Sequence, residues 1–436
     1  MSAPDFSLLG KRRFGPIFVV QFLGAFNDNA LKFALLFLAN FSIYADQPDK
    51  AEMLASLATG IFILPYFFFS SLSGQVSDMV DKARVIRWVK AAEIAIMALG
   101  LVGLWAHSIP VLLGALFLMG VHSTVFGPVK YVILPQHLGG HEIMGGTGLI
   151  EAGTFVAILG GQLLAGVIQP WETGLVAMAL AVIGFVASLA VPTAPPVERT
   201  GRIDWNILRG SRAILRTASN GRGVWLSILG ISWFFAAGAV LVSEFAPLAS
   251  GVLDARQEVV TLFLLVFSLS VAAGSLVVNR LLKGEVSARY VPVSALLMAG
   301  FLLDLWLSTN GFKVRTAGAT IMTFLATPGA VHVLVGLAGV AFAGGMFVVP
   351  LYAFLTTTVR KSEAARTVAA NNIVNSLAMV LGSAISIGLT VDGVSATNQL
   401  TFAAAMCVIS AWLAWKLHKA CDDVVCVDHT GLPPTV

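Results

Sequence analysis

The sequence has little charge and few cysteines. Only 11% of its 436 residues are Asp, Glu, Lys or Arg, about half the fraction usual in soluble domains. Of its three cysteines, Cys407 lies in an apolar run and Cys421 and Cys426 lie in the tail, so no disulfide framework is expected. The sequence contains no phosphate-binding loop of the Gly-x4-Gly-Lys-Ser/Thr type, which excludes an ATP-driven pump built from this chain alone. No cofactor is expected.

Long apolar runs take the place of the missing charge. The chain is 57% hydrophobic with a mean hydropathy of +0.86, and runs of about 20 apolar residues, enough to span a membrane, recur along it. Because a helix satisfies its own backbone in lipid, the expected fold class is an all-α membrane protein. We predict twelve transmembrane helices, at residues 16–41, 54–78, 86–107, 110–134, 146–168, 173–192, 223–249, 259–282, 289–308, 331–358, 366–391 and 397–417.

The Lys and Arg residues predict the orientation. With the N-terminus in the cytoplasm, only four of the 27 fall in outer loops, namely Lys50, Arg256, Lys313 and Arg315. This bias places both termini in the cytoplasm. The sequence pI near 9.0 therefore reports membrane orientation, and no nucleic-acid partner is expected. The opening residues form a short polar arm before a run that is too long for a cleavable signal peptide.

A hydrophilic stretch divides the chain into two halves. We predict an N-terminal half at 1–194, a cytoplasmic linker at 195–222, a C-terminal half at 223–417 and a cytoplasmic tail at 418–436. Residues 127–161 align without a gap on 349–383, with Pro128 on Pro350 and Gly160 on Gly382, which indicates a repeat. Two six-helix halves resemble the major facilitator fold, in which the substrate binds between the halves.

The loop after the second predicted span carries a candidate conformational latch. In "GQVSDMVDKARVIR" (74–87), Gly74 and Asp78 are followed by Lys82 and Arg84, a pattern that resembles the major-facilitator loop between spans two and three. Asp78 at a helix end can pair with basic groups or a facing helix terminus and so hold one conformation. The alternative is ordinary interfacial charge.

Ionisable residues within spans cost roughly 2.5–3.5 kcal/mol each at a helix centre, so each needs a reason. The stretch "QFLGAFNDNALKF" (21–33) carries Asp28 and, one turn later, Lys32, close enough to neutralise each other. Asn27 and Asn29 add amides. We predict that these four residues line a polar cavity and bind substrate. A hydrogen-bonded clip between helices is the alternative.

Lys130 and Glu151 lie at similar depth on consecutive antiparallel helices and are predicted to pair. The pair is either a static bridge or one that opens to offer a charge to each end of a zwitterion. The second repeat has amides instead, at Asn371, Asn372 and Asn375. Glu244 ends the seventh span as either a substrate gate or an interfacial charge.

Other polar and aromatic residues receive simpler interpretations. Glu93 is predicted to be a helix charge near the cytoplasm, and Asp304 to be wetted near the outer surface. His137 and His141 have Gly139 and Gly140 between them, which argues against a helical metal site. The aromatic stretches 65–70 and 232–238 either line an apolar cavity or pack against lipid and neighbouring helices.

Several stretches are similar to the lysophospholipid transporter family of the major facilitator superfamily. They include "QFLGAFNDNALKF", "ARVIRWVKAAEI" (83–94), "GPVKYVILPQHL" (127–138), "GLIEAGTF" (148–155), "SILGISWFF" (227–235) and "VAANNIVNSLAMV" (368–380). The Asn-Asp-Asn-x-x-Lys form most resembles the transporter domain of fused proteins that also carry a glycerophospholipid acyltransferase and an acyl-carrier-protein ligase.

This resemblance implies a function. The chain would flip lysophosphatidylethanolamine and lysophosphatidylglycerol to the cytoplasmic leaflet of a bacterial inner membrane by alternating access, for reacylation. It would be a monomeric transporter rather than an enzyme, and an acyltransferase or acyl-ACP synthetase would be its partner. The family's charged positions carry over to Asp28, Lys130 and Glu151. One position departs from the family pattern. Val242 stands near where the family has an Arg, and Lys32 would take over the role of that Arg.

Two other functions stay open. One is a proton-coupled exporter of small amphiphiles that uses Asp28 or Glu151. The other is a membrane scaffold for an acyltransferase, in which the buried charges are structural.

Overall fold

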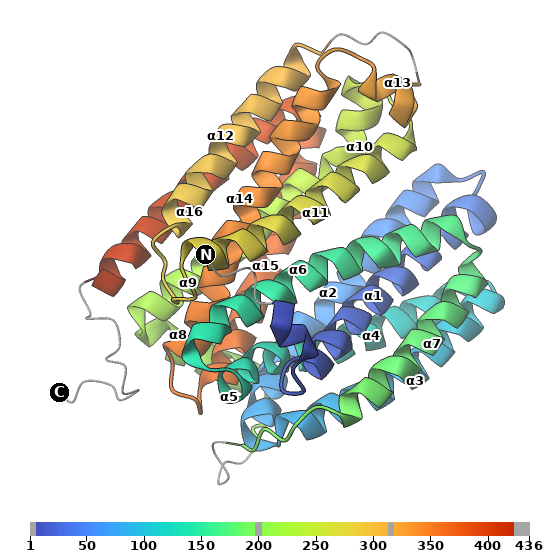
Figure 1. The fold of residues 1–436 in the computed structure, drawn as a ribbon. Helices are drawn as coiled ribbons and strands as arrows, with labels where there is room; N and C mark the ends of the chain where they lie inside the picture. The colour runs from blue at the N-terminus through green and yellow to red at the C-terminus, as the bar shows by residue number, and fades with distance from the viewer. Residues whose placement is uncertain (1–5, 197–202, 313–317, 423–436) are drawn as a thin grey trace.

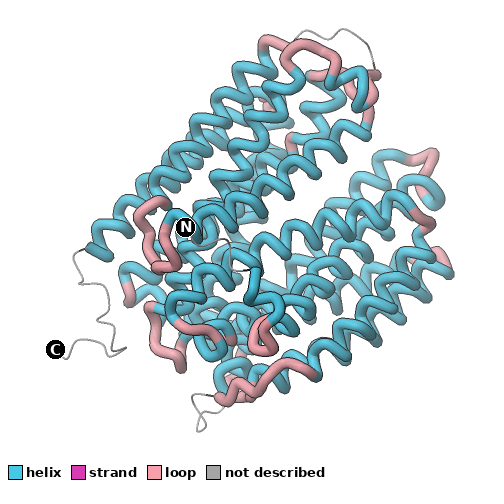
Figure 2. The backbone as a smooth tube through the Cα atoms, in the orientation of Figure 1, coloured by secondary structure: helices cyan, strands magenta, loops and turns pink. Residues whose placement is uncertain are grey.

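The computed structural model describes residues 6–196, 203–312 and 318–422 (Figure 1). Within these ranges the regular structure is helical (Figure 2), with no strand. Most of the predicted tail, and the outer-loop residues Lys313 and Arg315, lie outside the described residues.

Within the described residues, twelve long helices form the body of the structure. The first six are α1 (Gly15–Leu38), α2 (Pro48–Met79), α3 (Lys82–Trp105), α4 (Ile109–Val132), α6 (Gly140–Val167) and α7 (Pro170–Leu189). The other six are α9 (Arg222–Ser243), α11 (Gln257–Leu281), α12 (Val291–Asn310), α14 (Ala330–Thr357), α15 (Ala364–Val391) and α16 (Ala396–Asp422). Each coincides with a predicted span to within a few residues, which confirms the predicted fold class.

Shorter helices extend or connect these twelve. They are the 3-10 helix Phe6–Gly10, the π-helices Ala39–Ile43 and Leu248–Val252, α5 (Leu134–His137), α8 (Ile207–Asn220), α10 (Phe245–Pro247) and α13 (Ile321–Leu325). Eleven helical segments among the described residues are long and apolar enough to cross a membrane. The remaining long helix, α3, packs against α4 and α7.

Local sequence signals begin several of these helices. Proline stands in the first turn of α1, α2, α4 and α7, where its missing N–H costs nothing. Asp81 caps α3 by accepting a hydrogen bond from the Arg84 backbone N–H at 3.2 Å. At the start of α6, Glu142 accepts from the Gly139 N–H at 3.0 Å and pairs with Lys11 and Arg13 at 3.2 and 2.6 Å. The N-terminal arm is thereby held against this end of the bundle.

The helices group into two halves, α1–α7 and α9–α16, as Figure 1 shows. The internal repeat has a structural counterpart, because α4 and α14 each contain a proline within the helix, Pro128 and Pro350. The next long helices along the chain, α6 and α15, are both 28 residues long. The exact domain boundaries stay a prediction.

The amphipathic helix α8 lies at one end of the bundle, against α2 and α15 (Figure 1). We call this end the linker side. The Asp204 backbone N–H donates to Gln75 Oε1 at 2.8 Å, and Gly210 lies where a Cβ atom would come within 2.6 Å of Ser71 Oγ. The linker therefore contacts helices of both halves.

Candidate substrate cavity

A cavity of about 330 Å³ lies between the two halves. Helices α1, α2, α4 and α6 line it from the N-terminal half, and α9, α14 and α15 from the C-terminal half. Its acidic and basic residues all come from the N-terminal half: Asp28, His122, Lys130 and Glu151. Much of the remaining wall is apolar, with Phe62, Ile63, Phe126, Phe155, Ile158, Phe235 and Met379. The volume is at the lower end of the range for ligand pockets.

Asp28 lines this cavity, as predicted, but it does not pair with Lys32. Ser123 of α4 donates its hydroxyl to the Asp28 carboxylate, with Oγ at 2.9 Å from Oδ1 and 2.8 Å from Oδ2. No ion pair joins Asp28 to Lys32, and Lys32 is not among the lining residues. The Lys32 ammonium lies 5.9 Å from the centroid of the Phe33 ring. The spacing of one turn was therefore a poor guide, because α4 supplies a better partner for Asp28.

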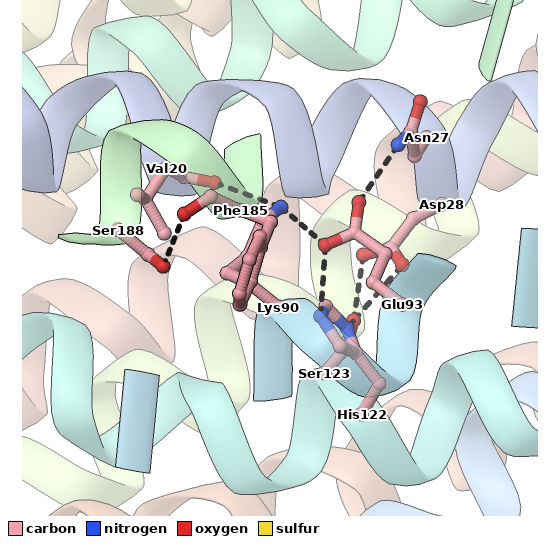
Figure 3. A network of polar contacts seen from close by, with 9 residues as sticks. All are labelled: Val20, Asn27, Asp28, Lys90, Glu93, His122, Ser123, Phe185 and Ser188. Atoms are coloured by element: carbon pink, nitrogen blue, oxygen red, sulfur yellow. Dashed lines mark hydrogen bonds and ion pairs between the residues drawn. The ribbon is translucent and has the colours of Figure 1, made fainter. Parts of the chain in front are cut away.

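The two asparagines beside Asp28 point to different places. Asn29 lines the cavity and donates to the Ala25 carbonyl at 2.9 Å. Asn27 is fully buried and donates to Glu93 Oε1 of α3 at 2.7 Å (Figure 3). Asn27 thus belongs to a helix–helix clip, the alternative considered for this stretch.

Glu93 is the residue that sequence reasoning most misjudged. It is fully buried, whereas it was predicted to be a helix charge near the cytoplasm. It forms an ion pair with Lys90, and its Oε2 lies 3.1 Å from His122 Nε2 (Figure 3). A histidine inside an apolar run, His122, was the available signal for a buried charged partner.

Lys130 and Glu151 both line the cavity, but the predicted ion pair between them is absent from this structure. Glu151 instead accepts a hydrogen bond from the Tyr131 hydroxyl, and the Lys130 ammonium lies 4.8 Å from the centroid of the Tyr131 ring. The Tyr131 ring stacks on Tyr352 of the other half, with centroids 4.4 Å apart and planes 6° apart. Tyrosine therefore takes the place of lysine as the partner of Glu151.

The C-terminal half contributes amides, as its repeat predicted. Asn372 and Asn375 line the cavity, whereas Asn371 is fully buried and does not. Within the described residues, Asn372 Nδ2 and Asn375 Oδ1 are buried without a hydrogen-bond partner. Such atoms are costly in a membrane interior unless a ligand or water satisfies them.

Glu244 and Val242 lie away from the cavity. Ser386 of α15 donates to Glu244 Oε1 at 3.0 Å, and Glu244 is 3% exposed and does not line the cavity. Val242 is 41% exposed on the surface. A side chain at position 242 does not reach the cavity here. Lys32 does not line the cavity either, so it does not take the place of the expected Arg.

The aromatic stretches divide between the two interpretations considered for them. Tyr66 and Phe235 line the cavity, whereas Phe67 and Phe68 are exposed on the surface of α2. Asp304 is partly exposed and lies 2.9 Å from His332 Nε2. No group of three metal-ligating side chains occurs in the part of the chain that the structure describes.

The predicted latch lies on the linker side. Asp78 of α2 is 2% exposed and pairs with Arg366 Nε of α15 at 3.3 Å. At Gly74 a Cβ atom would lie only 2.9 Å from Ala369 Cβ and 3.1 Å from Arg366 Cα. Both residues therefore join the two halves. Lys82 is buried near Asp78, and Arg84 is exposed.

A two-half helical bundle with a central polar cavity and an ion pair across the halves at one end is the arrangement of a membrane transporter. The model of the Major Facilitator Superfamily matches residues 17–383. The chain belongs to this superfamily.

Curated relatives support a finer comparison. The chain is 28% identical over 415 residues to the Lysophospholipid transporter LplT of Escherichia coli (strain SE11), covering 91% of this chain and 94% of that protein. The LplT protein of Escherichia coli (strain K12 / DH10B) gives the same identity and coverage.

Solved structures agree on the fold. The human organic anion transporter MFSD10 (TETRAN) superposes with a TM-score of 0.75 at 13% identity, covering 92% of this chain and 99% of that one. A bacterial homologue of the iron transporter ferroportin, in an outward-facing state, superposes with a TM-score of 0.67 at 12% identity, covering 93% and 99%.

Proposed function

We propose that the protein transports lysophospholipids, chiefly lysophosphatidylethanolamine and lysophosphatidylglycerol, to the cytoplasmic leaflet of a bacterial inner membrane. The observation that carries this proposal is the composition of the cavity wall. Opposite charges and unsatisfied amides gather with aromatic and aliphatic side chains in one space between the halves. A molecule with a zwitterionic or anionic head and a single acyl chain has the same two characters. The similarity to LplT supports this choice of substrate.

The head group would bind among the charged residues. Lys130 supplies the cation for the phosphate, and Asp28 and Glu151 are the carboxylates available to an ethanolamine ammonium. Asn372 and Asn375 supply a donor and an acceptor from the other half. When substrate binds, Glu151 would give up its hydrogen bond from the Tyr131 hydroxyl and accept one from the substrate ammonium.

The acyl chain needs more room than the cavity offers. At about 330 Å³ the cavity suits a head group and glycerol. The acyl chain would leave the cavity along the apolar wall formed by residues such as Phe62, Phe155 and Met379, and it would extend into the lipid. This division leaves only the polar part of the substrate to cross the membrane inside the protein.

Alternating access follows from the asymmetry of the bundle. The halves lie closest at the linker side, near α5 and α8, and diverge toward α13 (Figure 1). The Asp78–Arg366 pair joins the halves on the linker side, and the Tyr131–Tyr352 stack joins them at the cavity wall. With the linker side in the cytoplasm, this is an outward-facing state, and the latch of Gly74 and Asp78 would release when the halves rock.

Reacylation on the cytoplasmic side would consume the product. An acyltransferase or acyl-ACP synthetase is therefore the expected partner, acting on lysolipid delivered to the inner leaflet.

The test is uptake of labelled lysophosphatidylethanolamine by proteoliposomes, comparing wild type with Asp28→Asn. Asp304→Asn is the matched control, because Asp304 is also a helix carboxylate bonded to a neighbouring side chain but lies outside the cavity. Wild-type uptake that is lost in Asp28→Asn and kept in Asp304→Asn supports the proposal. No uptake above empty liposomes contradicts it, and pH-driven efflux of other amphiphiles would then favour an exporter.

A further inference from the structure

A cluster of ionisable side chains lies beside Asp28 (Figure 3), and its histidine lines the cavity. It consists of Lys90 and Glu93 of α3 and His122 of α4, which are 1%, 0% and 6% exposed. Glu93 pairs with Lys90 and with His122 Nε2, and it accepts from Asn27. The Lys90 ammonium also lies 3.5 Å from the Val20 carbonyl. Head-group binding uses none of these three side chains, so the cluster needs another explanation.

The contacts of the His122 ring favour its doubly protonated form. Ser123 has one hydroxyl proton and donates it to Asp28. Ser123 Oγ, at 3.4 Å from His122 Nδ1, is then an acceptor. On the other side of the ring, Nε2 faces the Glu93 carboxylate, which is also an acceptor. Both ring nitrogens therefore face acceptors, and only the imidazolium has two N–H donors.

The charge count also favours one added proton on this group. Asp28 and Glu93 carry two negative charges when ionised, and Lys90 carries one positive charge. With a neutral imidazole the group has a net charge of minus one inside the membrane, where an uncompensated charge is costly. One added proton makes the group neutral.

The proton has a route to water, because His122 and Asp28 both line the cavity. We propose that this cluster is a proton-binding site, with the proton held at His122, and that the proton travels with the phosphate-bearing head group. This inference rests on the proposed lysophospholipid transport. It assigns Glu151 to the substrate ammonium, since Asp28 serves the proton site.

The other titratable groups that line the cavity with His122 come from α4 itself and from neighbouring helices. Lys130 of α4 and Glu151 of α6 line the same cavity and together add no net charge, and Tyr66 of α2 is neutral. A phosphate entering beside Lys130 adds one negative charge. Proton binding and phosphate binding therefore favour each other, and this linkage is reciprocal.

The proton step is a simple transfer. One proton passes from water on the open side to a His122 nitrogen, and after the halves rock it leaves to water on the linker side. Only an N–H bond forms and breaks, and nothing is oxidised or reduced. A proton gradient directed inward would thus drive lysolipid toward the cytoplasmic leaflet.

The test measures proton and lipid movement together in proteoliposomes that enclose a pH-sensitive dye. Wild type should acidify the interior as labelled lysophosphatidylglycerol enters. At low substrate concentration, uptake should fall as the external pH rises, because proton binding and phosphate binding favour each other. Lysophosphatidylethanolamine should behave alike, because the phosphate is common to both lipids.

Two substitutions at one position separate the proton site from a structural role. His122→Gln cannot hold the extra proton, so it should bind lysolipid weakly at every pH and move no protons. His122→Lys carries a fixed charge, so it should bind lysolipid equally well across the pH range, also without proton movement. The matched control is His332→Gln, because His332 also contacts an aspartate but lies outside the cavity. It should retain the wild-type pH profile.

The outcomes distinguish this inference from the proposed function. Absence of lysolipid uptake in wild type overturns the proposed function itself. Uptake that is independent of pH and unaccompanied by proton entry overturns the proton site alone. Alkalinisation of the interior during uptake would show exchange rather than joint movement, and would also overturn it. Equal pH profiles for wild type and His122→Lys would assign any proton to another group.

Discussion

The ring of Tyr131 lies flat against the ring of Tyr352, with centroids 4.4 Å apart and planes 6° apart. The two residues come from α4 and α14, one in each half, so this stack is a direct contact between the two halves. In the internal repeat, Tyr352 aligns with Lys130, the residue before Tyr131. Matching positions of the two halves thus carry a cation and an aromatic ring, and both line the same cavity.

Tyr352→Ala should weaken the closure of the cavity toward the linker side. Aromatic pairs contribute about 0.5–1.5 kcal/mol beyond the apolar area they bury, so the closed linker side should lose roughly that amount of free energy. Linker-side access of a thiol reagent to a cysteine introduced at position 376 measures this loss. Phe41→Ala is the control, because it removes a stacked ring whose partner, Phe37, lies in the same half. Equal accessibility in the two variants would contradict a role for the stack in closure.

Lys130→Gln should weaken lysolipid binding more than it lowers the maximal rate. A hydrogen bond to a charged group is worth about 1.5–3 kcal/mol, so the concentration for half-maximal uptake should rise by roughly tenfold to a hundredfold. The matched control is Lys416→Gln: both ammonium groups lie over a neighbouring aromatic ring, at 4.8 Å for Lys130 and 3.6 Å for Lys416, but Lys416 does not line the cavity. An unchanged half-maximal concentration in Lys130→Gln would remove Lys130 from the phosphate site.

Prediction from sequence succeeded for features that depend on the residue pattern along one helix. It failed for side-chain contacts in which the partner lies on another helix. Apolar run lengths located the twelve long helices to within a few residues. The cavity positions of Asp28, Lys130 and Glu151 followed from the cost of charge in lipid and from family resemblance. Their partners did not, because Ser123, Tyr131 and Tyr352 become neighbours only when the helices pack.

Glu93 and Arg366 also have environments that depend on how the helices pack. A glutamate three residues after a lysine is common on exposed helix surfaces, and only packing against α1 and α4 buries Glu93. Arg366 was the first residue of the predicted span 366–391 and received no role, yet in α15 it pairs with Asp78 across the two halves. Neither the burial of Glu93 nor this pairing can be read from residue spacing along the chain.

Asp204→Asn should leave the pH profile of uptake unchanged between about pH 5 and 8. Hydrogen bonds from the Arg209 side chain, at 2.6 and 2.7 Å, lower the pKa of Asp204 from 3.8 to about 2. A lowered pKa means that this pair contributes stability above about pH 3.8, and the contribution is lost as the pH falls toward 2. The group therefore stays ionised throughout the working range. A pH profile altered in that range by Asp204→Asn would show that the linker, rather than the cavity, senses protons.

Gly74→Leu should hold the linker side open. The Cβ atom of any larger residue at position 74 would lie 2.9 Å from Ala369 Cβ, 3.1 Å from Arg366 Cα and 3.2 Å from the Ala365 carbonyl oxygen, so α2 and α15 would have to separate. The separation would also pull Asp78 from Arg366, and breaking a buried ion pair is itself destabilising. Both effects favour the state in which the linker side is open.

Spin labels at positions 12 and 361, both exposed on the linker side in opposite halves, report the separation in a cysteine-free background. Gly74→Leu should shift the distance distribution to longer values and lower lysolipid uptake by about tenfold or more, because overpacking costs typically 1–3 kcal/mol. Gly60→Leu is the matched control, since Gly60 lies on the same helix with no atom within 4 Å of the added Cβ position. An unchanged distance distribution in Gly74→Leu, with the protein folded, would mean that α2 and α15 do not form the latch.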